Sequence, residues 1–92
     1  MKVLKTTSQF KKDYKKCKKR GLDMSLLENV LDRLLEGKEL EKKHRDHALT
    51  GNYKGFRECH VQPDWLLIYA SDDTQLILTA VRTGSHSDLL NL

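Results

Sequence analysis

The sequence FRECHVQPDWLLIYA, residues 56–70, predicts two adjacent β-strands joined by a tight turn. Gln62–Asp64 has the composition of a turn, and the run from Trp65 to Ala70 is apolar almost throughout. Such a run is typical of a central strand that is buried on both faces. Because so short a connection joins only antiparallel neighbours, the stretch indicates a hairpin at the centre of a sheet.

A third strand is predicted at residues 75–83, after the turn-forming segment Ser71–Thr74. Its short connection to the second strand makes the three strands an antiparallel meander. Because side chains alternate between the two faces of a strand, we expect Arg82 to share a face with Leu78 and Ala80.

The first forty residues predict one strand and two helices. Lys2–Thr6 is strand-like, and Ser8 is the expected N-cap of a helix that ends at Gly21. Asp23 is the expected N-cap of a second helix, which Gly37 stops. The apolar residues that recur on one face of these helices are Phe10, Tyr14, Cys17, Leu26, Leu27, Val30, Leu31, Leu34 and Leu35.

These elements follow the order β-α-α-β-β-β, an α+β fold in which two N-terminal helices pack on a small antiparallel sheet. Residues 38–52 are polar and lack a sustained period, so we expect a loop or an irregular helical turn there. A chain of 92 residues supports one hydrophobic core, and we expect residues 1–92 to form a single domain.

The composition argues against several classes of protein. Cys17 and Cys59 are the only cysteines and form no Cys-x-x-Cys pair, so we expect packed free thiols. No segment approaches the roughly 20 apolar residues of a membrane span. Met1–Lys5 also lacks the apolar run of a secretion signal. We therefore expect a cytoplasmic protein without a membrane partner.

Positive charge is concentrated in residues 11–20, which hold seven cationic side chains and one acidic one in a chain of net charge +4. Such a block is typical of a surface that binds a polyanion such as nucleic acid, or an acidic protein. A solvated helix face is the structural alternative. The cations are Lys11, Lys12, Lys15, Lys16, Lys18, Lys19 and Arg20.

Histidines lie around the predicted strand ends. His60 precedes the turn that holds Asp64, and His86 follows the last strand shortly after Arg82. Strand ends joined by tight turns can converge, so we expect these four residues to line one surface, with His47 from the preceding loop. Metal-free cleavage of RNA needs a base, an acid and a cation for the phosphate, which histidine and arginine supply.

Each of these residues also has a structural interpretation. His60 alone fits a core histidine, Asp64 a turn cap, and Trp65 a core residue rather than a base-stacking one. His44 and His47 form a His-x-x-His pair without a third ligand at a zinc-site spacing, so we expect no metal site and no cofactor.

Three segments resemble the YafQ branch of the RelE/ParE superfamily, the toxins of type II toxin-antitoxin modules. They are residues 46–51 (DHALTG), 54–69 (KGFRECHVQPDWLLIY) and 82–89 (RTGSHSDL). The resemblance covers essentially the whole chain and implies the same RelE-like fold. It also implies a ribosome-dependent endoribonuclease, an mRNA interferase that cuts messenger RNA in the ribosomal A site.

Carried over by position, the resemblance implies catalytic roles for His47, His60, Asp64 and His86, and a phosphate-stabilising role for Arg82. We expect His86 to be the general acid, with Asp64 or His60 as the base and His47 orienting or sharing charge.

The implied partners are the ribosome with its messenger and a DinJ-like antitoxin, through which alone the toxin would reach operator DNA. The cations of residues 11–20 are then expected to contact ribosomal RNA phosphates or an acidic antitoxin tail. Trp65 matches a position of the branch's motif and is a candidate RNA contact. Leu90 stands where this branch commonly has Phe, and it lacks the stacking on a base that contributes about 1–3 kcal/mol.

Two other functions remain open from the sequence. The same fold serves ParE-like inhibitors of DNA gyrase, which bind without catalysis, and a nucleic-acid-binding regulatory module would use the histidines structurally. The clustered histidines favour the nuclease, because a protein that only binds has no need of proton carriers.

Overall fold

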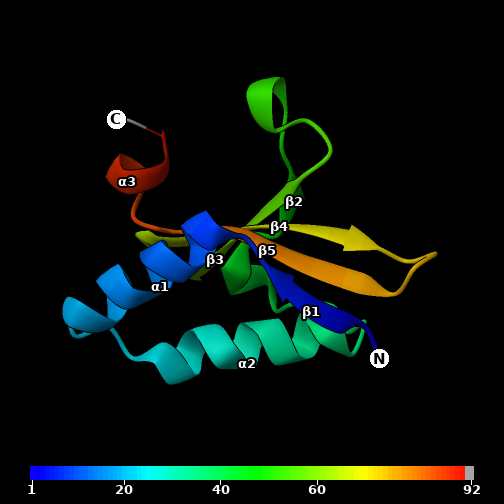
Figure 1. Ribbon diagram of the computed structural model, residues 1–92, viewed down its shortest axis with the longest axis horizontal. Helices are drawn as coiled ribbons and strands as arrows, with labels where there is room; N and C mark the ends of the chain where they lie inside the picture. Colours follow the sequence, from blue (N-terminus) through cyan, green and yellow to red (C-terminus); the bar gives the residue numbers. More distant parts are fainter. Residues whose placement is uncertain (91–92) are drawn as a thin grey trace.

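The computed structural model describes the backbone of residues 1–90 and the side chains of residues 1–89. Five strands form one sheet in the order β1-β5-β4-β3-β2 (Figure 1). The elements in chain order are β1 Val3–Thr6, α1 Ser8–Lys19, α2 Met24–Leu35, the 3-10 helix η1 Lys42–His44, β2 His47–Ala48, the 3-10 helix η2 Gly51–Tyr53, β3 Arg57–Gln62, β4 Trp65–Asp72, β5 Ile77–Gly84 and α3 His86–Leu90.

The predicted α+β class and the antiparallel β3-β4-β5 meander are confirmed. Strand β1 joins the sheet in parallel beside β5, a connection that the two intervening helices make possible. The predicted loop at 38–52 contains η1, β2 and η2, and α3 follows the last strand. The turns η1 and η2 fit the irregular helical turn expected in that segment, whereas β2 and α3 were not predicted, because two to five residues carry no measurable period.

Strand β4 lies at the centre of the sheet and is buried on both faces, as predicted. Its residues Trp65, Leu67 and Tyr69 face the main core between the sheet and the helices α1 and α2, whereas Leu66 and Ile68 face a second, smaller cluster. Figure 1 shows α2 below the sheet, with α3 and the segment that follows β2 above it. The sheet therefore has one face covered by helices and one covered mainly by loops and α3.

The helix boundaries agree with capping chemistry. The N-cap of α1 is Thr7 rather than the predicted Ser8, and its hydroxyl accepts the Phe10 N–H and donates to the Val81 carbonyl. Asp23 caps α2 as predicted, with its carboxylate accepting the Ser25 N–H. Gly21 follows α1 with a φ of +82°, a conformation that glycine adopts without steric cost.

Both cysteine thiols are buried and free, as predicted. Burial raises the pKa of the Cys59 thiol to about 12, so this neighbour of His60 stays protonated and is a poor nucleophile. Within residues 1–90, the structure contains no helix of the length and apolar character that crossing a membrane requires.

Candidate active site

The pairing of the strands places the candidate residues in two rows on the face opposite α1 and α2. Arg82 pairs with Ile68, Ile68 with Glu58 and Glu58 with His47, so one row crosses β5, β4, β3 and β2. The next row runs from Gly84 through Leu66 to His60. Leu66 and Ile68 are the apolar floor on which the polar side chains stand.

The predicted face of Arg82 was wrong. Tyr69 pairs with Ala80 but Ile68 pairs with Arg82, so Val81 is an extra residue in β5. Such a β-bulge interrupts the alternation of side chains. It turns Arg82 away from the face of Ala80 and onto the face that carries the histidines.

His86 and Asp64 are in close polar contact. Oδ1 of Asp64 lies 2.6 Å from Nδ1 of His86 and accepts the His86 backbone N–H at 3.0 Å. The backbone N–H first, and then the ring, hold the pKa of Asp64 below its usual range. Because an ionised carboxylate only accepts, Nδ1 carries a hydrogen and Nε2 is left for substrate.

His60 lies beside His86, with ring centroids 5.6 Å apart. Its Nδ1 is 3.3 Å from the Pro63 carbonyl oxygen in the turn between β3 and β4. The carbonyl oxygen of His60 in turn lies 2.6 Å from Nδ1 of His44, so His44 contacts the backbone of the site. Two imidazoles from different elements therefore converge at the end of the hairpin, as the sequence predicted.

Glu58 lies between His60 and His47. Its Oε1 is 3.5 Å from Nε2 of His47 and 4.0 Å from Nε2 of His60. The side chain is only 7% exposed, and among residues 1–89 no group donates a hydrogen bond to its buried Oε2. Nδ1 of His47 lies 2.6 Å from the Arg45 carbonyl oxygen, which leaves its Nε2 toward Glu58. A buried carboxylate oxygen without a partner is costly, and native proteins retain few of them.

Glu58 was not among the predicted site residues, because a glutamate in a strand is usually solvent-exposed. Its alternation with His60 was the available signal. The structure adds a buried carboxylate within reach of two imidazoles, which widens the possible acid-base pairs at the site.

Arg82 is anchored by Asp13 of α1. Nε and Nη2 of Arg82 donate to the Asp13 carboxylate at 3.0 and 3.1 Å, and the Thr83 backbone N–H donates to it at 3.2 Å. This pairing holds the pKa of Arg82 above its usual range. Strand β1 pairs with β5 only as far as Ala80, and Asp13 accepts the Thr83 N–H in place of a strand neighbour. Asp13 was not predicted, because it stands alone among lysines.

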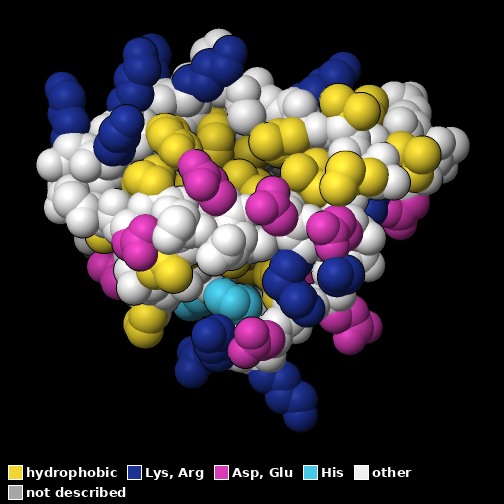
Figure 2. All heavy atoms as spheres, turned by 90° about the horizontal axis from the view of Figure 1, so that it is seen from below, with side chains coloured by type: hydrophobic (Ala, Val, Ile, Leu, Met, Phe, Trp, Pro, Cys, Tyr) yellow, Lys and Arg dark blue, Asp and Glu magenta, His cyan; other side chains and the backbone are white. Residues whose placement is uncertain are grey.

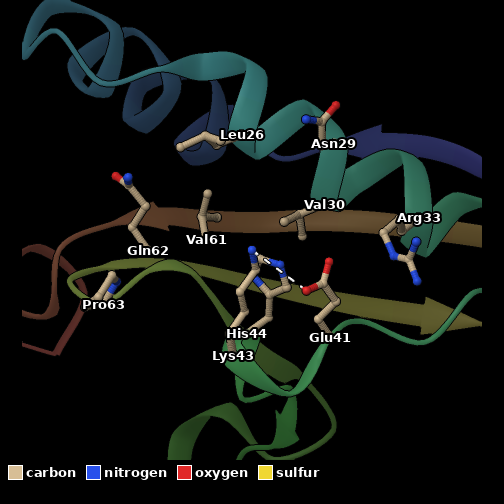
Figure 3. A pocket seen from close by; sticks show the side chains of 10 residues that line it. All are labelled: Leu26, Asn29, Val30, Arg33, Glu41, Lys43, His44, Val61, Gln62 and Pro63. Carbon is tan, nitrogen blue, oxygen red and sulfur yellow. Dashed lines mark ion pairs between the residues drawn. The ribbon is translucent and has the colours of Figure 1, made fainter.

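The site opens into a hollow of about 400 Å³ beside the two imidazoles. A larger hollow, of about 500 Å³, lies between α2 and the end of β3 (Figure 3). Figure 3 shows Leu26 and Val30 of α2 on one side of it and His44 on the other. The smaller hollow is lined by Lys43, Arg45, His60, Pro63 and His86, and it contains the groups suited to proton transfer.

One predicted RNA contact, Trp65, does not fit this surface. Trp65 is 2% exposed, lies in the main core and donates its indole N–H to Thr83, so the predicted base stacking does not fit its position. The side chain of Leu90 lies outside the described part of the structure, and its predicted contact stays a prediction.

The seven cationic side chains of residues 11–20 are all exposed. Figure 2 shows Lys and Arg side chains projecting along one edge of the molecule, in the region where α1 lies in Figure 1. Lys16 and Arg20 pair with Asp88 of α3, so this basic surface borders the candidate site. Among residues 1–89, the other five cations of this block form no ion pair.

Comparison with known proteins identifies relatives over nearly the full chain. Residues 2–91 match the family described as "Bacterial toxin of type II toxin-antitoxin system, YafQ". The mRNA interferase toxin YafQ of Escherichia coli (strain K12) is 39% identical over 84 residues, which cover 90% of this chain and 89% of that protein.

Solved structures agree with this match. A chain of the E. coli DinJ-YafQ complex is 37% identical, with a TM-score of 0.88 over 97% of this chain and 98% of that chain. A metal-bound toxin from Helicobacter pylori is 43% identical, with a TM-score of 0.91 over 97% of this chain and 99% of that chain.

Proposed function

This chain belongs to the YafQ family of bacterial type II toxins, and we propose that it is an mRNA interferase that cuts messenger RNA on the ribosome. The observation that carries this proposal is the convergence of His60, His86 and Asp64 beside a hollow, with Glu58 in the next row of the sheet. Its proposed target places its activity in the cytoplasm.

The proposed reaction is an attack of the ribose 2′-oxygen on the adjacent phosphorus. We assign His60 Nε2 as the base that takes the 2′-hydroxyl proton, with Glu58 stabilising the imidazolium that forms. His86 gives its Nε2 proton to the departing 5′-oxygen as the P–O bond breaks, and Asp64 holds the ring in that orientation. The products are a 2′,3′-cyclic phosphate and a free 5′-hydroxyl.

Arg82 is assigned to the charge that develops on the phosphate oxygens. Neighbouring strands lie about 4.8 Å apart, so the paired positions from Arg82 through Ile68 to Glu58 span about 10 Å at the backbone. The long side chain of Arg82 points to the same face as Glu58 and stays charged beside Asp13. His47 lies on the other side of Glu58, and we assign it to share the charge of the Glu58 carboxylate.

We also propose that cleavage needs no metal ion, because two imidazoles, two carboxylates and an arginine supply every proton and charge that the reaction requires. The test strips the toxin with a chelator and transfers it into buffer that holds only the Mg²⁺ the ribosome needs. We expect an unchanged cleavage rate. An inactive stripped toxin that regains activity with Zn²⁺ or Cu²⁺ would overturn this part of the proposal.

The partners we propose are the translating ribosome and a DinJ-like antitoxin, as in the E. coli complex. The exposed cations of α1 supply a salt-sensitive contact with ribosomal RNA. Reversal of Lys15 and Lys19 to Glu should weaken cosedimentation with ribosomes. The matched control reverses Lys5 and Lys38, two exposed lysines outside α1, and should bind ribosomes like the parent.

The decisive experiment maps messenger 5′ ends in a translation extract after addition of the parent protein or of His86→Ala. We expect in-frame cuts at defined codons with the parent and none with the variant. Unchanged cuts with His86→Ala would refute the assignment of the acid. Arrested growth without any cuts would refute cleavage and point to gyrase or another target that is bound and not cut.

A further inference from the structure

We propose that Asp88 is a positioning residue that fixes His86 against Asp64, an inference that rests on the proposed role of His86. Helix α3 contains five residues, and its first is His86. So short a helix does not hold itself in water, because nucleation is unfavourable and few internal hydrogen bonds offset it. The orientation of His86 therefore depends on contacts from outside the helix.

Asp88 supplies more of these contacts than any neighbouring residue. Its Oδ2 lies 2.6 Å from Nη1 of Arg20, its Oδ1 lies 3.1 Å from Nη2, and Nζ of Lys16 is 3.4 Å away. The Arg20 guanidinium holds the pKa of this carboxyl well below its usual range. The side chain is only 16% exposed. A bidentate, partly desolvated pair of this kind joins α3 firmly to the end of α1.

Asp88 also closes the first turn of α3. Its Oδ2 accepts the Ser85 N–H at 3.0 Å, while the Ser85 hydroxyl accepts the Asp88 N–H at 3.1 Å. This reciprocal pair is a capping box, here with aspartate in place of the usual glutamate. The His86 N–H between them donates to Asp64. Loss of the box would therefore free the backbone that holds the imidazole.

Gly84 provides the space that Asp88 occupies. A Cβ added at Gly84 would lie 2.9 Å from Oδ2 and 3.0 Å from Cβ of Asp88, closer than such atoms approach. Any side chain at position 84 would displace the carboxylate from Ser85 and Arg20. The residues of Gly84-Ser85-His86-Ser87-Asp88 therefore form one turn, in which Gly84, Ser85 and Asp88 together hold His86 in place.

The alternative is that Asp88 only reduces the positive field of α1. The two interpretations differ in the cleavage rate they predict for a variant without this carboxylate. If Asp88 only reduces the positive field, removal of its charge beside Lys16 and Arg20 strengthens binding of a polyanion and does not slow cleavage. A positioning role instead predicts slower cleavage with equal or tighter binding.

The test compares Asp88→Asn with Asp73→Asn, which removes the same charge from an exposed carboxylate that pairs with Lys2 in the β4-β5 turn. With saturating ribosome-messenger complexes, we expect kcat to fall about tenfold in Asp88→Asn, the change expected for loss of one helix-capping interaction, with KM unchanged or lower. Asp73→Asn should match the parent. In ¹⁵N NMR spectra, amide exchange at His86 should accelerate only in Asp88→Asn.

Second variants separate positioning from folding. Asp88→Glu keeps the charge and the capping box and should recover most of the lost rate, whereas Gly84→Ala should reproduce the loss. Equal kcat in Asp88→Asn and the parent, while His86→Ala is inactive, would overturn this inference and leave the proposed function intact. Full activity of His86→Ala would instead refute the proposed function itself.

Discussion

The two faces of the sheet differ in what covers them and in what they contain. The face covered by α1 and α2 carries the main apolar core, to which Leu67 of β4 contributes. The other face carries a smaller cluster that includes Leu66, and around it lie the histidines, Glu58 and Arg82. In the central strand β4, residues such as Leu67 therefore stabilise the main core, and the alternate residues such as Leu66 support the reactive groups on the other face.

The two faces also differ in whether their buried polar groups have hydrogen-bond partners. On the helix-covered face, the Trp65 N–H and the Thr83 hydroxyl have partners, since Trp65 donates to Thr83 and Thr83 donates to the Leu66 carbonyl. On the other face, a buried carboxylate oxygen of Glu58 has no partner within the part of the chain that the structure describes. The buried Glu58 oxygen without a described partner therefore lies on the face on which catalysis is proposed, and departures of this kind from full hydrogen bonding are expected at functional sites.

The largest expected effect comes from Glu58→Gln, which changes the polar face alone. An amide does not stabilise an imidazolium, so the cleavage rate should fall about 10²-fold or more. The free energy of unfolding should stay the same or rise, because a neutral amide is less costly to bury than a carboxylate oxygen without a partner. Single-turnover cleavage and urea unfolding measure the two quantities.

Glu36→Gln is the matched control, since Glu36 is an exposed glutamate paired with Lys38 after α2. Its rate should equal that of the parent. A Glu58→Gln protein that cleaves at the parental rate would show that the buried carboxylate has no part in the reaction.

The next effect compares two adjacent residues on opposite faces, Leu66→Ala and Leu67→Ala. Both side chains are fully buried, so each variant should lose about 2–5 kcal/mol of unfolding free energy. Only Leu66→Ala should also slow cleavage per folded molecule, because Leu66 pairs with His60 across the strands. Equal rates in the two variants would contradict the division of labour between the faces.

Much of the fold could be predicted from the sequence because long periodic segments form it. Helices α1 and α2 and strands β3 to β5 follow from apolar spacing and turn composition, within two residues at their ends. Strand β2 and helix α3 could not, because their two and five residues gain their structure from register and capping. The bulge at Val81 gave no local signal, and it decided the face of Arg82.

The candidate site was predictable where a turn joins its parts. His60 and Asp64 flank the Pro63 turn, and His86 follows a strand that ends beside it, so their convergence followed from topology. Glu58 and Asp13 were missed, because their importance depends on burial and on partners distant in sequence. Asp13 reaches Arg82 across 69 positions, which no local pattern records.

A smaller effect is expected from Asp13→Asn, which weakens the link between α1 and the polar face. The carboxylate accepts hydrogen bonds from Arg82 and Thr83, so its loss should cost about 1–3 kcal/mol of unfolding free energy. Cleavage should slow because Arg82 is no longer held. Asp32→Asn, which removes the same charge from an exposed position on α2, should change neither quantity. A parental rate in Asp13→Asn would show that Arg82 needs no anchor.

The smallest effect is a pH dependence of stability that belongs to Asp88. Its pKa is lowered in the folded protein, chiefly by Arg20, from an unfolded value of about 3.9. A lowered pKa gives stability that is fully present above pH of about 4 and is lost as the pH falls through the folded value. The difference in unfolding free energy between the parent and Asp88→Asn should therefore narrow from pH 7 to about pH 2.5. Urea unfolding across this range measures it, and Asp73→Asn should show a smaller change because the Asp73 carboxylate is exposed to solvent, which screens its charge. If this difference in unfolding free energy stayed constant with pH, the Asp88 carboxyl would have the same pKa in the folded and unfolded protein. Arg20 would then not hold α3 through charge.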